Sequence, residues 1–263
     1  MLRGRALKVG MWVAVLGLLA WSSPAARAAG KADVMKALQT LQNEVKSYSA
    51  NGQSKFTMRE RTFEQTLTVV AKASGKYKET TKSERMGTQT ERATTCDGKT
   101  VWLPAGRDGQ IRSIDRAAVA KALGIQDVKS VYLPRDPIDL ANPFLALSAD
   151  TIKYIGQEKM GDTDVHVFEG QAKWPAMRRR EAEPFWPRQK LMISAKDGLL
   201  RSVTTLDREG AESRVLTYTD VKINPPVADD VFAFKAPEGA AVEDATQATI
   251  DQMKEAMAAA KKP

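Results

Sequence analysis

Residues 97–104 read DGKTVWLP, and this stretch places large apolar side chains on both faces of one predicted strand. Its first two residues are typical of a tight turn and its final proline ends strand pairing, so a short strand is predicted between them. Side chains alternate along a strand, so Val101 and Leu103 point to one face and Trp102 to the other. Both faces of the sheet therefore need an apolar cover at this point.

The same two-residue period recurs on either side of this stretch. Phe56 and Met58 share one strand face, and Leu67 and Val69 share a face of the following strand. Further strands are predicted at 76–95, 111–114, 152–157, 164–168, 189–194, 200–207 and 214–223, separated by turn residues such as Asp197-Gly198. With no linker or break in composition, the pattern indicates one domain of successive antiparallel strands.

Helical spacing is confined to three places. Residues 32–48 carry an apolar stripe at spacings of three and four, and residues 116–123 form a short helix closed by Gly124. A C-terminal helical tail is predicted over residues 243–263, with acidic residues toward its start and lysines at its end. The proline-rich stretch 132–150, which contains Phe144 and Leu147, is predicted to be a loop and a short helix laid over a surface.

The N-terminus has the features of a secretory signal. Three basic residues precede an apolar run over 9–21, and Ala26-Arg27-Ala28 matches a signal-peptidase site. We interpret residues 1–28 as a cleaved signal, so that the mature chain begins at residue 29 and is periplasmic. Removing the four cations of this segment lowers the formal net charge from +8 to +4.

Charge and composition exclude two classes of function. The mild positive charge and the lack of a basic helix with interleaved aromatics argue against nucleic-acid binding. His166 is the only histidine and stands between valines, with no serine elbow, metal-ligand spacing or glycine-rich phosphate loop nearby. The sequence therefore predicts a protein that is not an enzyme and holds neither metal nor cofactor. The single cysteine, Cys96, is interpreted as structural.

Three motifs resemble the outer-membrane lipoprotein carrier (LolA) family. They are DGKTVW at 97–102, DGLLRSVTTLDREG at 197–210 and NPPVADDVFAFKAPEGAAVED at 224–244. The last is the most informative, because Asn224, Phe232, Phe234, Pro237, Gly239 and Val242 stand where that family repeats an ending of the form N…F-x-F-x-x-P-x-G-x-x-V. None of the motifs is catalytic.

The resemblance implies a mainly β fold with helices, an incompletely closed antiparallel β-barrel over residues 29–242 whose helices cover an apolar cavity. The expected cavity residues are apolar: Phe56, Met58, Leu67, Val69, Trp102, Phe144 and Leu147. The implied function is that of a monomeric periplasmic carrier or chaperone for the acyl chains of lipids or lipoproteins. Partner proteins of the inner or outer membrane are expected to interact with it. An alternative reading for Trp102 is that it fills a core.

The sequence departs from the family at two places. Ala73 and Ser74 occupy the positions of an arginine and a proline that help set the open and closed states in the family. An inserted loop carries Arg178, Arg179 and Arg180 beside aromatic residues, which is interpreted either as a contact for lipid head groups or a partner, or as a solvated loop. The alternative function is a non-enzymatic envelope sensor or regulatory module built on the same barrel.

Overall fold

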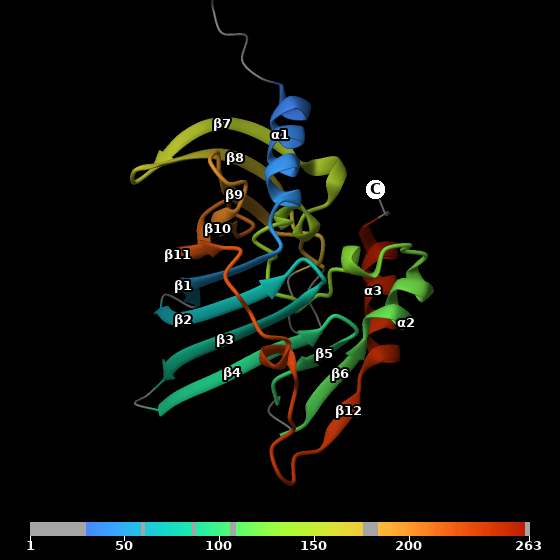
Figure 1. Cartoon of the computed structure of the whole chain (residues 1–263). Coiled ribbons are helices and arrows are strands. Elements are labelled where there is room, and N and C mark those ends of the chain that lie inside the picture. The colour runs from blue at the N-terminus through green and yellow to red at the C-terminus, as the bar shows by residue number, and fades with distance from the viewer. Residues whose placement is uncertain (1–29, 59–60, 86–87, 106–108, 176–183, 261–263) are drawn as a thin grey trace, which may run out of the picture.

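The computed structural model describes residues 30–58, 61–85, 88–105, 109–175 and 184–260, and these form a single large sheet with helices (Figure 1). The strands are β1 (Ser47–Met58), β2 (Arg61–Lys72), β3 (Lys76–Arg85), β4 (Thr88–Asp97), β5 (Thr100–Leu103), β6 (Ile111–Asp115), β7 (Lys153–Met160), β8 (Thr163–Gln171), β9 (Arg188–Ser194), β10 (Leu200–Leu206), β11 (Glu212–Ile223) and β12 (Val242–Asp244). The helices are α1 (Lys31–Asn43), α2 (Arg116–Leu123) and α3 (Thr246–Ala260), with 3-10 turns η1 (Val128–Ser130), η2 (Pro143–Ala146), η3 (Ala149–Thr151) and η4 (Asp229–Phe232).

The sheet has the strand order β12-β6-β5-β4-β3-β2-β1-β11-β10-β9-β8-β7. Its neighbours run antiparallel except for β12 and β6, which are parallel. The end strands β12 and β7 do not pair with each other in the described chain, so hydrogen bonds do not close the sheet. The predicted fold class, an open, mainly β arrangement with helices, is confirmed.

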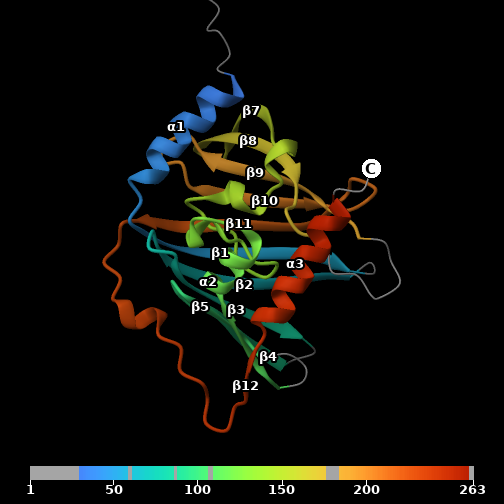
Figure 2. The same cartoon turned by 90° about the vertical axis from the view of Figure 1, so that its right-hand side faces the viewer.

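The sheet curls around the chain that connects α2 to β7. Seen from the side in Figure 2, this connection, α2 and α3 lie in front of the strands, while α1 crosses the end of the sheet near β7 to β11. No helix in the described ranges combines the length and the apolar character needed to cross a membrane.

Two apolar cores fill the concave side. The first core joins α1 to β1, β2 and β8 to β11, and contains Val34, Leu38, Leu67, Val69, Leu147, Phe168 and Leu191 among its buried residues. The second core joins β5 and β6 to α2 and α3, and contains Val101, Leu103, Ile114, Val119, Trp174, Ile250 and Met253. Tyr77 of β3 packs against both cores, so the inner surface is continuous from one half of the sheet to the other.

The structure refines three of the predicted elements. The first helix ends at Asn43 rather than at residue 48, since Tyr48 already belongs to β1. The strand-like stretch 76–95 is two strands, β3 and β4. The tail over 243–263 contains the short strand β12 followed by α3, and α3 packs against α2 through the second core.

Candidate functional site

A pocket of about 470 Å³ opens between α1, the ends of β1 to β3 and the connection 127–145. Its apolar wall comes from all three parts: Met35 of α1, Val45 before β1, Val69 of β2, and Ile138, Phe144 and Leu145 of the connection. The pocket exists because the connection carries three prolines and lies across the sheet as an irregular segment instead of packing as a helix. The pocket therefore has a sheet wall, a loop wall and a helical wall.

The loop wall is held to the sheet by a tyrosine of β1. The Tyr48 hydroxyl donates a hydrogen bond to Asp139 Oδ1 at 3.0 Å and accepts one from the Leu140 backbone N–H at 3.1 Å. Asp139 also accepts from the Ala141 N–H at 2.9 Å. A buried hydroxyl thus meets two polar groups of a segment about ninety residues away in sequence, which satisfies groups that burial would otherwise leave unpaired.

A second tyrosine, from β3, repeats this arrangement. The Tyr77 hydroxyl donates to Asp136 Oδ1, and Asp136 Oδ2 accepts from the Leu133 N–H at 2.9 Å. Desolvation raises the pKa of Asp136, although the nearby Arg116 guanidinium and the Tyr77 hydrogen bond oppose the rise. Desolvation also raises the pKa of Tyr77 well above its ordinary value, so the hydroxyl stays protonated and remains a donor.

Arg116 is a buried charge at the inner end of the pocket. Its guanidinium donates to the Val131 carbonyl and to Cys96 Sγ, at 3.7 Å from the sulfur. Its Nε has no hydrogen-bond partner among the described residues. Asp136 is the acidic group whose charge acts most strongly on Arg116, so this carboxylate partly compensates the buried cation.

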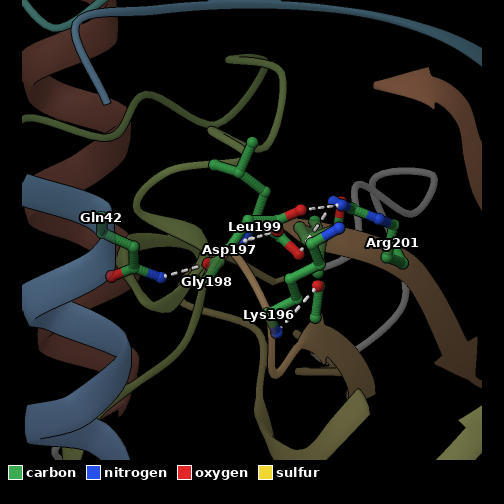
Figure 3. Close-up of polar contacts among 8 residues, drawn as sticks. Gln42, Lys196, Asp197, Gly198, Leu199 and Arg201 are labelled. Atoms are coloured by element: carbon green, nitrogen blue, oxygen red, sulfur yellow. Dashed lines mark hydrogen bonds and ion pairs between the residues drawn. The ribbon is translucent and has the colours of Figure 1, made fainter. Parts of the chain in front are cut away.

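The helical wall of the pocket is fixed at both ends of α1. Lys31 Nζ donates to the Ile152 carbonyl at 2.6 Å, and Gln42 Nε2 donates to the Gly198 carbonyl at 2.8 Å. Figure 3 shows Gln42 reaching from α1 to the turn between β9 and β10, where Asp197 accepts from the Leu199 N–H and pairs with Arg201. A Cβ on Gly198 would lie 3.1 Å from Leu38 O, so this turn approaches the helix as closely as a glycine permits.

The rim of the pocket is basic at the turn between β2 and β3. Lys72 and Lys76 flank this turn and line the pocket, together with Ala73, Gly75 and Lys129. Both flanking lysines bind Asp229 of η4, with Lys76 Nζ 2.8 Å from Asp229 Oδ2. The turn that the family resemblance connects with opening and closing therefore lies at the edge of the pocket.

The structure places the predicted cavity residues in different surroundings. Val69 and Phe144 line the pocket, and Leu67 and Leu147 are buried beside it in the first core. Phe56 stacks on Phe63 farther along β1 and β2, at 5.4 Å between ring centroids. Met58 ends β1, and its side chain lies outside the described part.

Trp102 lies on the opposite face of β5 from Val101 and Leu103. Those two residues belong to the second core, whereas Trp102 is half-buried and stacks on Phe234 of the segment that returns from β11. Of the residues that the structure describes, Trp102 is not one that lines the pocket. Arg178, Arg179 and Arg180, like the predicted signal at 1–28, lie outside the described residues.

Sequence reasoning misses the polar residues of the site. The sequence pattern places Tyr48 in a helix and Tyr77 in a strand without a role, and it gives Asp136 and Asp139 no function beyond the turns of the proline-rich stretch. The available signal is the spacing of Asp136 and Asp139 within the proline-rich stretch, where apolar residues such as Ile138 and Leu140 stand beside them. Such acids need partners when the loop is laid over a sheet.

Comparison with known proteins yields structural neighbours only. No protein-family model matches the sequence, and no curated protein matches it. An uncharacterized conserved protein from Thermus thermophilus is 12% identical with a TM-score of 0.48, covering 81% of this chain and 98% of that one. MucB is 15% identical with a TM-score of 0.42, covering 79% and 64%. A LolA superfamily protein from Nitrosomonas europaea is 12% identical with a TM-score of 0.36, covering 79% and 99%. The family that the sequence motifs resemble is thus represented among the neighbours.

Proposed function

We propose that this protein is a non-enzymatic binding protein of the bacterial envelope, which shields the acyl chains of lipids or lipoproteins in the pocket between α1 and the connection 127–145. The single observation that carries the proposal is the pocket itself. Its volume of about 470 Å³ falls in the range of small-molecule sites, roughly 300–1,000 Å³, and an apolar strip runs from α1 to the connection.

The energetics of such a site require no reactive group. Each methylene removed from water contributes roughly 0.8 kcal/mol, so burial of about ten methylenes supplies the roughly 8 kcal/mol of micromolar binding, and a long acyl chain has enough of them to offset part of the cost of association as well. Two acids of the pocket wall are engaged by tyrosines that hold the loop, Asp136 by Tyr77 and Asp139 by Tyr48, and a third, Asp127, caps η1. These groups support a role in shaping the pocket rather than in chemistry on the ligand.

The proposed location is the periplasm, and it rests on the sequence of residues 1–28. N-terminal sequencing of the protein from the periplasmic fraction of a Gram-negative host should give Ala29 as the first residue. A membrane-bound product that retains Met1 would contradict this location.

The binding test uses the mature chain and an apolar fluorescent probe. We expect saturable fluorescence enhancement and displacement of the probe by a fatty acid. Met35→Trp should weaken binding, because Met35 lines the pocket and the larger indole fills it. Lys36→Trp, one residue along α1 on its exposed side, is the matched control and should bind normally. Equal binding by both variants would show that the probe binds elsewhere.

A finer question is whether the cargo is passed on as in the lipoprotein carriers. We propose that it is not, because Ala73, which lines the pocket, and its neighbour Ser74 stand in place of arginine and proline. In a host depleted of its own carrier, this protein should fail to restore growth and outer-membrane lipoprotein content. Full rescue would instead make it a lipoprotein carrier.

A further inference from the structure

The turn between β2 and β3 connects the pocket to a segment from the far end of the chain. Lys72 and Lys76 are among the residues that line the pocket at its rim, and their ammonium groups bind the carboxylate of Asp229. Lys129 approaches the turn from the pocket side, since a Cβ on Gly75 would lie 3.6 Å from Lys129 Cγ. Three cations therefore gather around one turn at the pocket rim.

Asp229 belongs to the irregular segment 224–241, which follows β11 and crosses β3 and β4 before β12 (Figure 1). Its side chain is 63% exposed, whereas the side chains of Lys72 and Lys76 are only 25% and 26% exposed. The two lysine side chains are thus mostly buried at this contact, whereas the carboxylate of Asp229 is mostly exposed to solvent. This contact shows that the two lysines can bind one carboxylate together, because each ammonium group donates a hydrogen bond to a different carboxylate oxygen.

The remainder of the segment is anchored without Asp229. Asn224 Oδ1 accepts from the Lys46 N–H at 2.7 Å, and the Asn224 N–H donates to the Ser47 carbonyl at 2.8 Å. Phe232 is 1% exposed and holds the segment against the sheet. Loss of the Asp229 contact therefore frees one carboxylate without detaching the whole segment.

We propose that the pocket binds an amphiphile with a carboxylate head group, that is, a fatty acid, and that its carboxylate replaces that of Asp229 between Lys72 and Lys76. The inference rests on the proposed acyl-chain site and specifies its ligand class. The acyl chain lies along the apolar strip, and the head group reaches the rim, where Lys129 adds a third positive charge. A carboxylate is chosen because a carboxylate already occupies this position.

The first experiment measures the affinity of the mature protein for oleate and for methyl oleate below micelle-forming concentrations. The two ligands share a chain and differ in charge. We expect oleate to bind about fivefold more tightly, the ratio expected for a partly screened charged contact of about 1 kcal/mol. Lys72→Gln combined with Lys76→Gln should abolish this ratio. Lys99→Gln combined with Lys222→Gln removes the same charge from residues that do not line the pocket, and should preserve it.

The second experiment removes the internal competitor. Asp229→Asn should increase oleate affinity about threefold and leave methyl oleate unchanged, because the amide competes less well for two ammonium groups. Asp230→Asn, its neighbour, is the control for net charge and should change neither affinity. Hydrogen exchange at residues 228–231 should rise when oleate is bound to the wild type, and should stay constant with methyl oleate or with acetate at equal concentration.

Equal affinity for oleate and methyl oleate in the wild type would overturn the carboxylate site and leave acyl-chain binding intact. The same exchange response to acetate as to oleate would also overturn it, because the site would then recognise any carboxylate without a chain. Binding of neither oleate nor methyl oleate would remove the proposed function itself, and this inference with it.

Discussion

The indole of Trp102 stacks on the ring of Phe234, with 5.2 Å between the ring centroids and 12° between the ring planes. Trp102 belongs to β5 and Phe234 to the segment that returns from β11, so the contact joins parts of the chain that are distant in sequence. The second apolar face of β5 is therefore covered by this returning segment. Both aromatic residues of the motif at 224–244 hold the returning segment in place. Phe232 is buried, and Phe234 stacks on Trp102.

Trp102→Ala and Phe234→Ala should each lower the free energy of unfolding, and their effects should be coupled. Stacked aromatic pairs contribute about 0.5–1.5 kcal/mol beyond burial, so a double-mutant cycle in urea should give a coupling energy in that range. Acyl-chain binding by both variants should match the wild type, because of the described residues neither is among those lining the pocket. A loss of binding in a folded Trp102→Ala protein would contradict this placement.

Tyr77→Phe should destabilise the protein by about 1–3 kcal/mol, since it leaves an oxygen of the half-buried Asp136 carboxylate without its donor. The remaining hydrogen bond, from the Leu133 N–H, cannot serve both oxygens. Tyr154→Phe is the matched control, because within the described ranges its hydroxyl has a hydrogen-bond contact with the partly buried His166 ring, at 3.1 Å, and none with a carboxylate. Urea denaturation of the two variants measures the difference, and equal losses of stability would argue against a special role for the Tyr77 hydroxyl.

Acid should loosen the segment 224–241 at Asp229. Hydrogen bonds from Lys72 and Lys76 lower the pKa of Asp229 from 3.8 to about 2. Because the folded-state pKa lies below the unfolded value of about 4, the contact is fully stabilising above pH 4 and is lost as the pH falls toward 2. Hydrogen exchange around residue 229 should rise across this window in the wild type and stay level in Asp229→Asn. A parallel rise in both proteins would assign the acid response to other carboxyl groups.

Gly198→Ala should shift α1. The glycine has φ of +72°, and an added Cβ would lie 3.1 Å from both Leu38 O and Leu41 Cβ of that helix. Gly161→Ala provides a control with φ of +59° and no atom within 4 Å of the new Cβ, so it carries only the backbone cost of about 1 kcal/mol. We expect the Gly198 variant to lose more stability and to show faster hydrogen exchange in α1. Identical behaviour of the two would mean that the turn has room to move.

Most strands of this fold were predictable because each is paired with its sequence neighbour. In such strands, apolar residues at every second position, such as Leu67 and Val69, indicate the face that is buried, and residues 214–223 follow the same pattern. The turn residues between strands then mark the hairpins. The first helix was predicted too long for a related reason. Val45 and Tyr48 continue its apolar period because they are buried in the same core, although the helix ends at Asn43 and Val45 N–H already donates to Gln42 O in a tighter turn.

The contacts that build the site could not be read from periodicity. Tyr48 and Asp139 meet only because the connection 127–145 crosses the sheet, and no local pattern encodes that crossing. The same holds for β12, three residues long, whose parallel pairing with β6 depends on the path of the segment before it. Trp102 illustrates the limit most clearly, because alternation predicted that it faces away from Val101 but not which part of the chain covers it.

The position of β1 in the middle of the sheet has a consequence for folding. Its partner on one side, β2, follows directly, and such hairpins form in about 1–10 μs. On its other side β1 pairs with β11, where Phe56 lies opposite Arg214. That edge of β1 therefore stays uncovered until the long stretch of chain between the two strands is in place. Closing so large a loop is slow, and an uncovered strand edge recruits other polypeptides. A folding intermediate that has formed the β1–β2 hairpin but has not yet paired β1 with β11 is therefore the species in which this edge of β1 is open to aggregation.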